Sequence, residues 1–126
     1  MQLASSKIHH SDPLYSRVYM YRLLPDGTSA AVAYNGKTPD SDRSNAASGD
    51  LVRALRNGVN CCISQVHSDD PVPVNSHTTG SELIVLIRRH DEIIGAIDIE
   101  SDLPDAFSDV EQQAVVEVAD ALAALL

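Results

Sequence analysis

Thiol groups are the most reactive side chains in this sequence, and they occur only at Cys61 and Cys62. Adjacent cysteines rarely form a disulfide with each other, because the ring is strained and neighbouring side chains of a strand point to opposite faces. They also lack the Cys-x-x-Cys spacing of zinc sites and thioredoxin-type redox sites. We therefore expect two reduced residues in a strand, one of them facing the core. A reactive thiol at one of the two positions is the alternative.

Carboxylates lie at the edge of one apolar segment and inside another. Glu82 directly precedes the run Leu83–Ile87, and Asp98 interrupts the run that begins at Ile93. A buried carboxylate needs compensating partners, so Asp98 must either face a ligand pocket or accept hydrogen bonds from backbone N–H groups. For Glu82 the alternative is a strand start beside solvent. Both residues are therefore candidate ligand-binding residues.

A long polar connection, His67–Gly80, contains the remaining candidates. Loops of this length within compact domains are often functional, and their polar residues contact ligands more often than those on regular faces. We name His67, Asn75 and His77 as candidate ligand contacts, with a loop cap as the alternative for His67. Either histidine could ligate a haem iron, but no sequence signature marks one.

Motifs of other site types are missing from the sequence. It has neither the Gly-x-Ser-x-Gly elbow of hydrolases nor a glycine-rich loop that would hold phosphates. His9 and His10 are adjacent, without the further ligands that a metal site would need. We therefore predict no metal site, and the cofactor, if the protein uses one, is unknown from sequence.

The composition narrows the classes of partner. The chain has 126 residues, 44% of them hydrophobic and 4% aromatic, and a formal charge of −9. The length fits one domain with its own core. The acidic balance argues against nucleic acid and membrane surfaces, and the few aromatics argue against aromatic ligand cages. Because no apolar run approaches about 20 residues and the start lacks a signal-peptide pattern, we expect a cytoplasmic domain.

The first half of the chain is dominated by strand patterns. Ser16–Leu24 and Ser29–Tyr34 flank a Pro-Asp-Gly turn and predict a hairpin. Asp50–Asn57 predicts a short amphipathic helix, and Val59–Val66 predicts a strand that carries both cysteines. The polar residues 1–13 are weakly patterned, so we expect a weakly ordered start.

The second half contains a strongly apolar hairpin. Leu83–Ile87 and Ile93–Glu100 predict its two strands, and the five polar residues 88–92 predict its turn. Both strands are apolar on both faces until Asp98. The hairpin is therefore expected in the middle of a sheet, with a layer on each side.

A helix is predicted for residues 108–126. Ser108 and Glu111 make a capping box at its start. Its apolar side chains recur at helical spacing and form one face, which covers the domain's own sheet or, alternatively, a second copy of the chain. The residues of that face are Val115, Val118, Leu122 and Leu125.

Three segments resemble the GAF domain family: Ser81–Val85, Ile94–Ser101 and Ala106–Gln112. A hydrophobic-Gly-hydrophobic-hydrophobic-Asp strand, followed by Phe-Ser-Asp before the last helix, is the family's most recognisable stretch. The resemblance is good from about Gly49 onward. It implies an α+β fold with a central antiparallel sheet, terminal helices on one face and a pocket of loops and a short helix on the other. It also implies a single GAF-like domain over residues 1–126.

Within that family, the second half of the chain resembles the free methionine-R-sulfoxide reductases. The matched motifs surround His67, Glu82 and Asp98. The resemblance implies that Glu82 and Asp98 line the pocket and contact an amine or hydroxyl group of a ligand. The catalytic cysteine of these reductases falls on Asn75, and a second functional cysteine falls near Leu51. The reaction needs thiolates, and these two positions lack them.

We therefore expect a non-catalytic sensory or regulatory domain that binds a small molecule. It would control an attached or partner output domain, as a homodimer or as part of a linked signalling protein. Two alternatives remain open. One is an enzyme resembling the sulfoxide reductases that uses Cys61 or Cys62 in place of the missing thiols. The other is a dimerisation module that binds no ligand.

Overall fold

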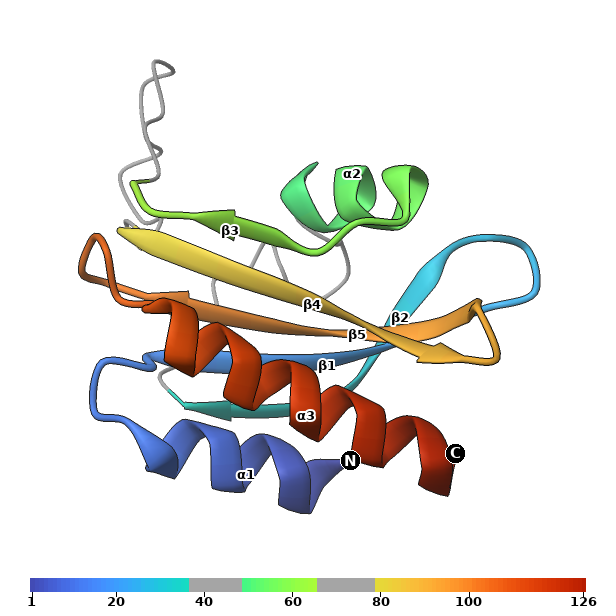
Figure 1. Ribbon diagram of the computed structural model, residues 1–126, viewed down its shortest axis with the longest axis horizontal. Coiled ribbons are helices and arrows are strands. Elements are labelled where there is room, and N and C mark those ends of the chain that lie inside the picture. Colours follow the sequence, from blue (N-terminus) through green and yellow to red (C-terminus); the bar gives the residue numbers. More distant parts are fainter. Residues whose placement is uncertain (37–48, 66–78) are drawn as a thin grey trace.

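The computed structural model describes residues 1–36, 49–65 and 79–126. Its strands form one five-stranded antiparallel sheet in the order β2-β1-β5-β4-β3 (Figure 1). The α+β fold with a central antiparallel sheet is therefore confirmed. In chain order the elements are α1 (Gln2–Ser11), β1 (Arg17–Leu23), β2 (Ser29–Gly36), α2 (Gly49–Asn57), β3 (Cys61–Ile63), β4 (Ser81–Arg89), β5 (Glu92–Ser101) and α3 (Asp109–Leu125).

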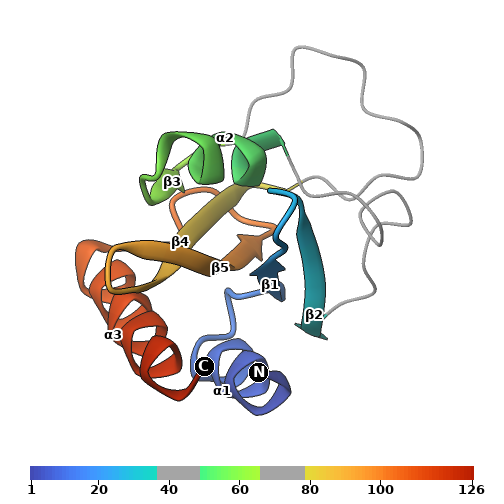
Figure 2. The same cartoon turned by 90° about the vertical axis from the view of Figure 1, so that its right-hand side faces the viewer.

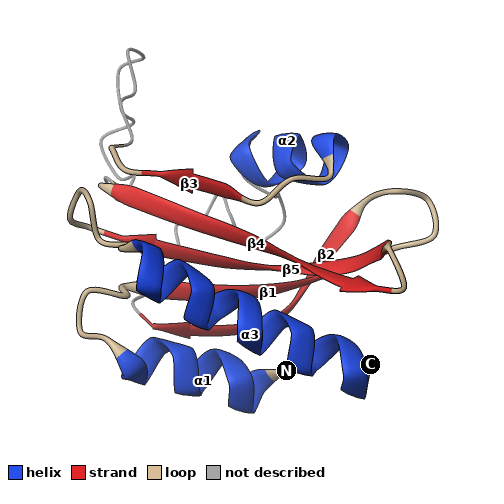
Figure 3. Cartoon of the chain, in the orientation of Figure 1, coloured by secondary structure: helices blue, strands red, loops and turns tan. Residues whose placement is uncertain are grey.

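Helices cover both faces of the sheet. Figures 2 and 3 show α1 and α3 on one face and α2 on the other. α3 packs mainly on β4, α1 packs on β1 and β2, and α2 packs on β4. Both chain ends lie on the side of α1 and α3 (Figure 2). The two faces of the sheet are therefore enclosed by different parts of the chain.

The central hairpin, β4 and β5, has a tighter turn than predicted. Arg88 and Arg89 continue β4 and pair with the start of β5, so the turn contains only His90 and Asp91. Both turn residues have positive φ angles, 49° and 68°. Two-residue turns of this kind match the twist of the strands that they join. The predicted turn of residues 88–92 was too long because charged residues at an exposed rim can still pair through their backbone.

The face under α1 and α3 holds the larger apolar core. Tyr15 stacks on Phe107 at the end of this core, with ring centroids 5.4 Å apart. Leu125 is 83% exposed, so the predicted apolar face of α3 docks only in part. The strands contribute Val18, Met20, Leu83, Val85, Ile97 and Ile99, and α3 contributes Val115, Ala119 and Leu122.

The start of the chain is helical, which corrects the expectation of a weakly ordered segment. α1 buries Ser5 and Ile8. The side-chain amide of Gln2 donates to the Tyr34 carbonyl oxygen at 2.8 Å and accepts from the Tyr34 N–H at 3.3 Å, so it occupies the outer edge of β2. A polar helix of this length is marginal by itself. Its stability comes from contacts distant in sequence, which its own residues do not reveal.

β3 is shorter than the predicted strand of residues 59–66. Within the described residues only Cys61–Ile63 pairs with β4. Just before it, the side chain of Asn60 accepts a hydrogen bond from the Leu86 N–H at 2.9 Å. The Asn60 side chain thus bonds to a backbone N–H group of β4 at the point where the backbone pairing of β3 with β4 ends.

Candidate functional site

Alternation along the strands places a second set of side chains on the face that α2 covers. Arg17 of β1 lies opposite Glu100 of β5, and Glu100 lies opposite Glu82 of β4. In the neighbouring row Tyr19 lies opposite Asp98. Residues paired in this way share a face and have Cβ atoms roughly 5 Å apart. We call Arg17, Glu82, Asp98 and Glu100 the charged cluster.

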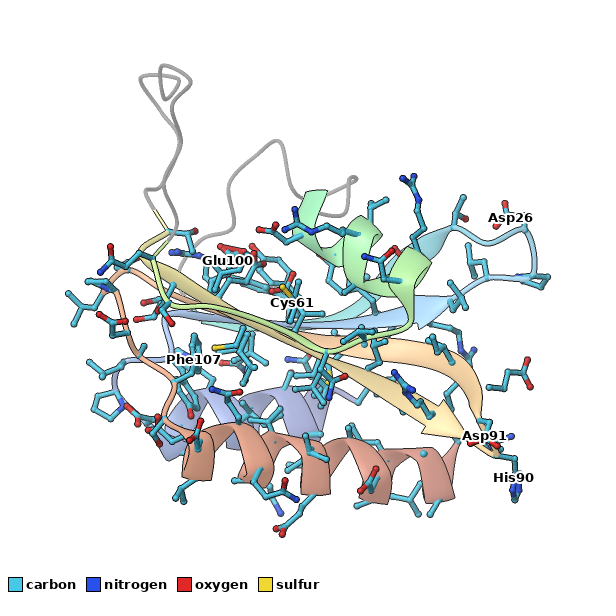
Figure 4. The ribbon with its side chains drawn as sticks, turned by 45° about the horizontal axis from the view of Figure 1, so that its top comes forward. Asp26, Cys61, His90, Asp91, Glu100 and Phe107 are labelled. Carbon is cyan, nitrogen blue, oxygen red and sulfur yellow. The ribbon has the colours of Figure 1, made fainter. Side chains whose placement is uncertain are left out.

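The charged cluster is buried. Its members are between 0% and 3% exposed, and they are all the buried charged side chains in the described part of the chain. One oxygen atom from each of the three carboxylates lies within 4.8 Å of the other two. Figure 4 shows Glu100 on the α2 side of the sheet and Phe107 on the opposite side. Three negative charges so close together, and away from water, need positive or hydrogen-bonding partners.

Arg17 supplies part of that compensation. Its Nε lies 3.5 Å from Glu100 Oε2, and its Nη2 donates to Asp102 Oδ1 at 2.9 Å. Thr79 also donates from its hydroxyl group to Glu100 Oε2, at 2.7 Å. The cluster thus brings three carboxylates together with one guanidinium. Such a set suits a ligand ammonium or hydroxyl group, or a hard cation such as Ca²⁺ or Mg²⁺.

Three of the four tyrosines gather beside the charged cluster. The ring centroids of Tyr19 and Tyr34 are 4.9 Å apart, and those of Tyr19 and Tyr21 are 6.0 Å apart. Burial raises the pKa of Tyr34, and the positive charge of Arg17 partly offsets that rise. The chain has few aromatics, but its topology concentrates them here. The amino-acid composition alone did not indicate this group of three tyrosine rings.

An apolar patch adjoins the charged cluster beneath α2. Leu51 of α2 is fully buried and packs with Ile84, Leu86 and Ala96 of the sheet. Leu51 stands where the resemblance places a second functional cysteine of the reductases. In this chain that position is part of a hydrophobic contact between helix and sheet.

The two cysteines are free, and their environments disfavour the thiolate. The pKa of Cys61 is raised by burial and then by the charge of Asp50, and Arg53 opposes these effects. The pKa of Cys62 is raised by burial and by its neighbours Cys61 and Asp109. Cys61 is half-buried beside the apolar patch, whereas Cys62 is exposed. Neither thiol has the lowered pKa that is typical of a cysteine nucleophile.

The structure brings two of the predicted site residues together. Glu82 and Asp98 are both in the charged cluster, so the alternative of a solvent-exposed Glu82 is wrong. His67, Asn75 and His77 lie outside the described residues. They stay predictions.

Two members of the charged cluster were not predicted. Glu100 follows Asp98 at the two-residue period of a strand, and that spacing could have indicated it. Arg17 starts a strand far away in sequence, so only the pairing of β1 with β5 reveals that it belongs to the site.

Comparison with known families shows to which family the chain belongs. The model of the GAF domain family matches residues 14–126. The chain belongs to the GAF domain family. A comparison with curated proteins finds no match. Within the described residues of this GAF domain, no helix is both long and apolar enough to cross a membrane.

Solved structures similar to this chain include free methionine-R-sulfoxide reductases and a GAF domain of a phosphotransferase. The type II free methionine-R-sulfoxide reductase of Thermoplasma acidophilum is 30% identical, with a TM-score of 0.84, over 99% of this chain and 88% of that chain. The free methionine-R-sulfoxide reductase of Neisseria meningitidis, in complex with its substrate, is 15% identical, with a TM-score of 0.79, over 98% and 73% of the two chains. The GAF domain of an Acinetobacter phosphoenolpyruvate-protein phosphotransferase is 12% identical, with a TM-score of 0.79, over 98% and 78%. The last two likenesses show the fold alone.

Proposed function

We propose that this GAF domain is a non-catalytic regulatory module that binds a small molecule at the charged cluster. The observation that carries the proposal is the burial of Glu82, Asp98 and Glu100 with carboxylate oxygens within 4.8 Å of one another. Carboxylate oxygens accept hydrogen bonds, so a ligand that presents an amine or hydroxyl group to them can form charge-assisted hydrogen bonds in the folded domain.

Several parts of the proposal extend beyond the charged cluster. His67, Asn75 and His77 would add further ligand contacts. Ligand binding would bias the packing of the helices on the opposite face, and through them an attached output domain or a second copy of the chain. With these links the domain would have the sensory role that GAF domains often have.

A thermal-shift screen tests the binding site. Metabolites that carry amine or hydroxyl groups are added to the wild-type domain, and a ligand at 100 times its dissociation constant should stabilise it by about 2.7 kcal/mol. Asp98→Asn and Glu82→Gln should abolish most of that shift. Glu92→Gln is the matched control, because Glu92 lies on the same strand as Asp98 but is exposed at its far end. A ligand that shifts all four proteins equally would contradict the proposed site.

A reductase remains the second candidate function. The observation that favours it is the 30% identity to the type II free methionine-R-sulfoxide reductase over nearly the whole chain. In that chemistry a thiolate attacks the sulfoxide sulfur, and a second thiol then resolves the product as a disulfide. Against it, the pKa of Cys61 is raised, and the side chains of Cys61 and Cys62, as neighbours in β3, point to opposite faces.

Turnover measurements separate the two functions. The wild-type protein, Cys61→Ser and Cys62→Ser are assayed with free methionine-R-sulfoxide and dithiothreitol. We expect no cysteine-dependent reduction. Activity that disappears in either serine variant would establish the enzyme and reject the binding-only role.

A further inference from the structure

A groove lies between α1 and α3, on the face of the sheet opposite the charged cluster. Figures 1 and 2 show the two helices side by side, and they rest on different strands: α1 packs on β1 and β2, and α3 packs on β4 and β5. The space between them has a volume of about 420 Å³, within the usual range of small-molecule pockets. We call this space the helix groove. Its apolar lining consists of Ala4, Ile8, Ala114, Val115 and Val118.

A tyrosine adds a polar group to this apolar lining. Tyr15 is only 4% exposed, and its ring stacks on Phe107 at the edge of the core. It also lines the helix groove, and in the part of the chain that the structure describes its hydroxyl group makes no hydrogen bond. A polar group that is left without a partner among apolar side chains costs free energy. A ligand atom that pairs with the Tyr15 hydroxyl group therefore gains affinity.

Two carboxylates stand near the Tyr15 hydroxyl group. Glu111 and Asp12 both line the helix groove, and after burial their charges raise the pKa of Tyr15, which places them near its oxygen. Glu111 Oε2 accepts from the Ser108 N–H at 2.8 Å, and Asp12 Oδ1 accepts from the Leu14 N–H at 2.8 Å. Among the described residues neither carboxylate forms an ion pair. Each therefore has a second oxygen that can accept a hydrogen bond from a ligand.

The charges around the helix groove favour a cationic ligand. Lys7 is the one basic side chain in its lining, against the two carboxylates. An anionic ligand would be repelled by Asp12 and Glu111, whereas an ammonium group would form charge-assisted hydrogen bonds with them. A second copy of the chain is disfavoured as the occupant, because α3 contains four acidic residues and no basic one, and each chain has a formal charge of −9.

We propose that the helix groove is a second ligand site, which binds a small apolar amine. The hydrocarbon part of the amine packs between α1 and α3, and its ammonium group pairs with Asp12 and Glu111 beside the Tyr15 hydroxyl group. The site lies on the opposite face from the charged cluster and uses none of its residues. It therefore stands independently of the function proposed above.

Three probes with one hydrocarbon tail and different head groups test this site. Hexylamine carries an ammonium group, hexanol a hydroxyl group and hexanoate a carboxylate. Their dissociation constants for the wild-type protein are measured by NMR chemical-shift titration, which also shows which backbone amides respond. Hexylamine should bind roughly tenfold more tightly than hexanol, the effect of about one charged hydrogen bond, and hexanoate should bind most weakly. The largest shifts should fall in α1 and in the first half of α3.

Conservative variants assign the preference to the two carboxylates. Glu111→Gln removes the charge but keeps a side chain that can complete the capping box, and Asp12→Asn keeps an acceptor for the Leu14 N–H. Each should weaken hexylamine binding roughly tenfold and leave hexanol binding nearly unchanged. Glu117→Gln is the matched control, because it removes the same charge from an exposed position of α3 outside the helix groove. Ala114→Leu should fill the groove and weaken hexylamine and hexanol alike.

The outcomes separate this inference from the proposed function. Hexylamine binding that disappears in Asp98→Asn and persists in Glu111→Gln would place the amine at the charged cluster, which would overturn the second site and support the first. Equal binding of the three probes, or equal effects of Glu111→Gln and Glu117→Gln, would also overturn it. The same holds for a wild-type dimer, detected by sedimentation, that hexylamine cannot enter. If no probe binds, the helix groove is rejected as an amine site, and the metabolite screen still tests the proposed function.

Discussion

Alternating residues of β1, β4 and β5 build two faces of the sheet that bury very different side chains. Under α1 and α3 the buried residues are apolar, as at Ile97 and Ile99. Under α2 their neighbours Asp98 and Glu100 are equally buried but charged. The apolar and the charged residues lie on the same strands and are equally buried. They reach opposite faces only because successive side chains of a strand alternate in direction.

The difference shows which face holds the fold together. Removing apolar surface from water stabilises a protein by roughly 25 cal/mol per Å², whereas burying like charges opposes folding. The apolar face therefore supplies stability, and the charged cluster depends on it. In the function proposed above, the charged face serves to bind a ligand.

The largest change in the free energy of unfolding is expected at Ile97. Its neighbour Asp98 is equally buried but lies on the opposite face of the sheet, so the two positions can be compared directly. Ile97→Ala should lower the free energy of unfolding by about 3–4 kcal/mol, because it leaves a cavity in the apolar core. Asp98→Asn should change it by less than about 1 kcal/mol, because it removes one of three crowded negative charges. Urea unfolding measures both values. Equal losses would show that the two faces contribute equally and would break the comparison.

Removal of the N-cap of α3 should lower the free energy of unfolding by an intermediate amount. Ser108 Oγ accepts from the Glu111 N–H at 3.2 Å, and the Glu111 carboxylate accepts from the Ser108 N–H at 2.8 Å. Ser108→Ala should therefore cost about 1 kcal/mol of unfolding free energy in the same urea experiment. Gln113→Ala, at an exposed position of the same helix, is the control and should have little effect. A loss no larger than that of the control would argue that α3 is held by packing alone.

High pH should weaken the fold through buried tyrosines on both faces. Burial first, and then the charges of Glu111 and Asp12, raise the pKa of Tyr15 from 10.0 to about 12. Because the raised pKa belongs to the folded state, the associated stability is complete below pH 10 and is lost as the pH rises toward 12. Tyr15→Phe should flatten this loss in urea unfolding across that range.

Tyr34→Phe provides the comparison from the charged face. The pKa of Tyr34 is raised by burial, but the charge of Arg17 opposes the rise. We therefore expect Tyr34→Phe to flatten the pH dependence less than Tyr15→Phe does. The reverse order would mean that the charge of Arg17 does not lower the pKa of Tyr34.

The smallest expected difference concerns the two thiols. Their raised pKa values should make both react with iodoacetamide more slowly than free cysteine near neutral pH. Cys62 should react several-fold faster than Cys61, because Cys62 is exposed and Cys61 is half-buried. Alkylation rates of Cys61→Ser and Cys62→Ser measure each thiol separately. A faster Cys61 would indicate an activated thiol on the charged face and would favour the reductase.

Local sequence patterns predicted the elements that carry a strong signal of their own, such as an apolar run or a capping box. The apolar runs of β4 and β5 and the capping box of α3 carried enough information to place these elements. α1 was missed because its stability comes from tertiary contacts, such as the pairing of Gln2 with the edge of β2. The turn between β4 and β5 was placed only approximately, because strand pairing extends into charged residues.

The sequence by itself determined that Glu82 and Asp98 stand in strongly apolar strands and must find partners. Its resemblance to the reductases also implied that Asn75, and a position near Leu51, stand where those enzymes have functional cysteines. Only the tertiary structure decided that Arg17 joins Glu82 and Asp98, and that three tyrosines line the same face. The physical reason is that antiparallel pairing of β1 with β5 places Arg17 opposite Glu100, which is distant in sequence, and no local pattern records that register.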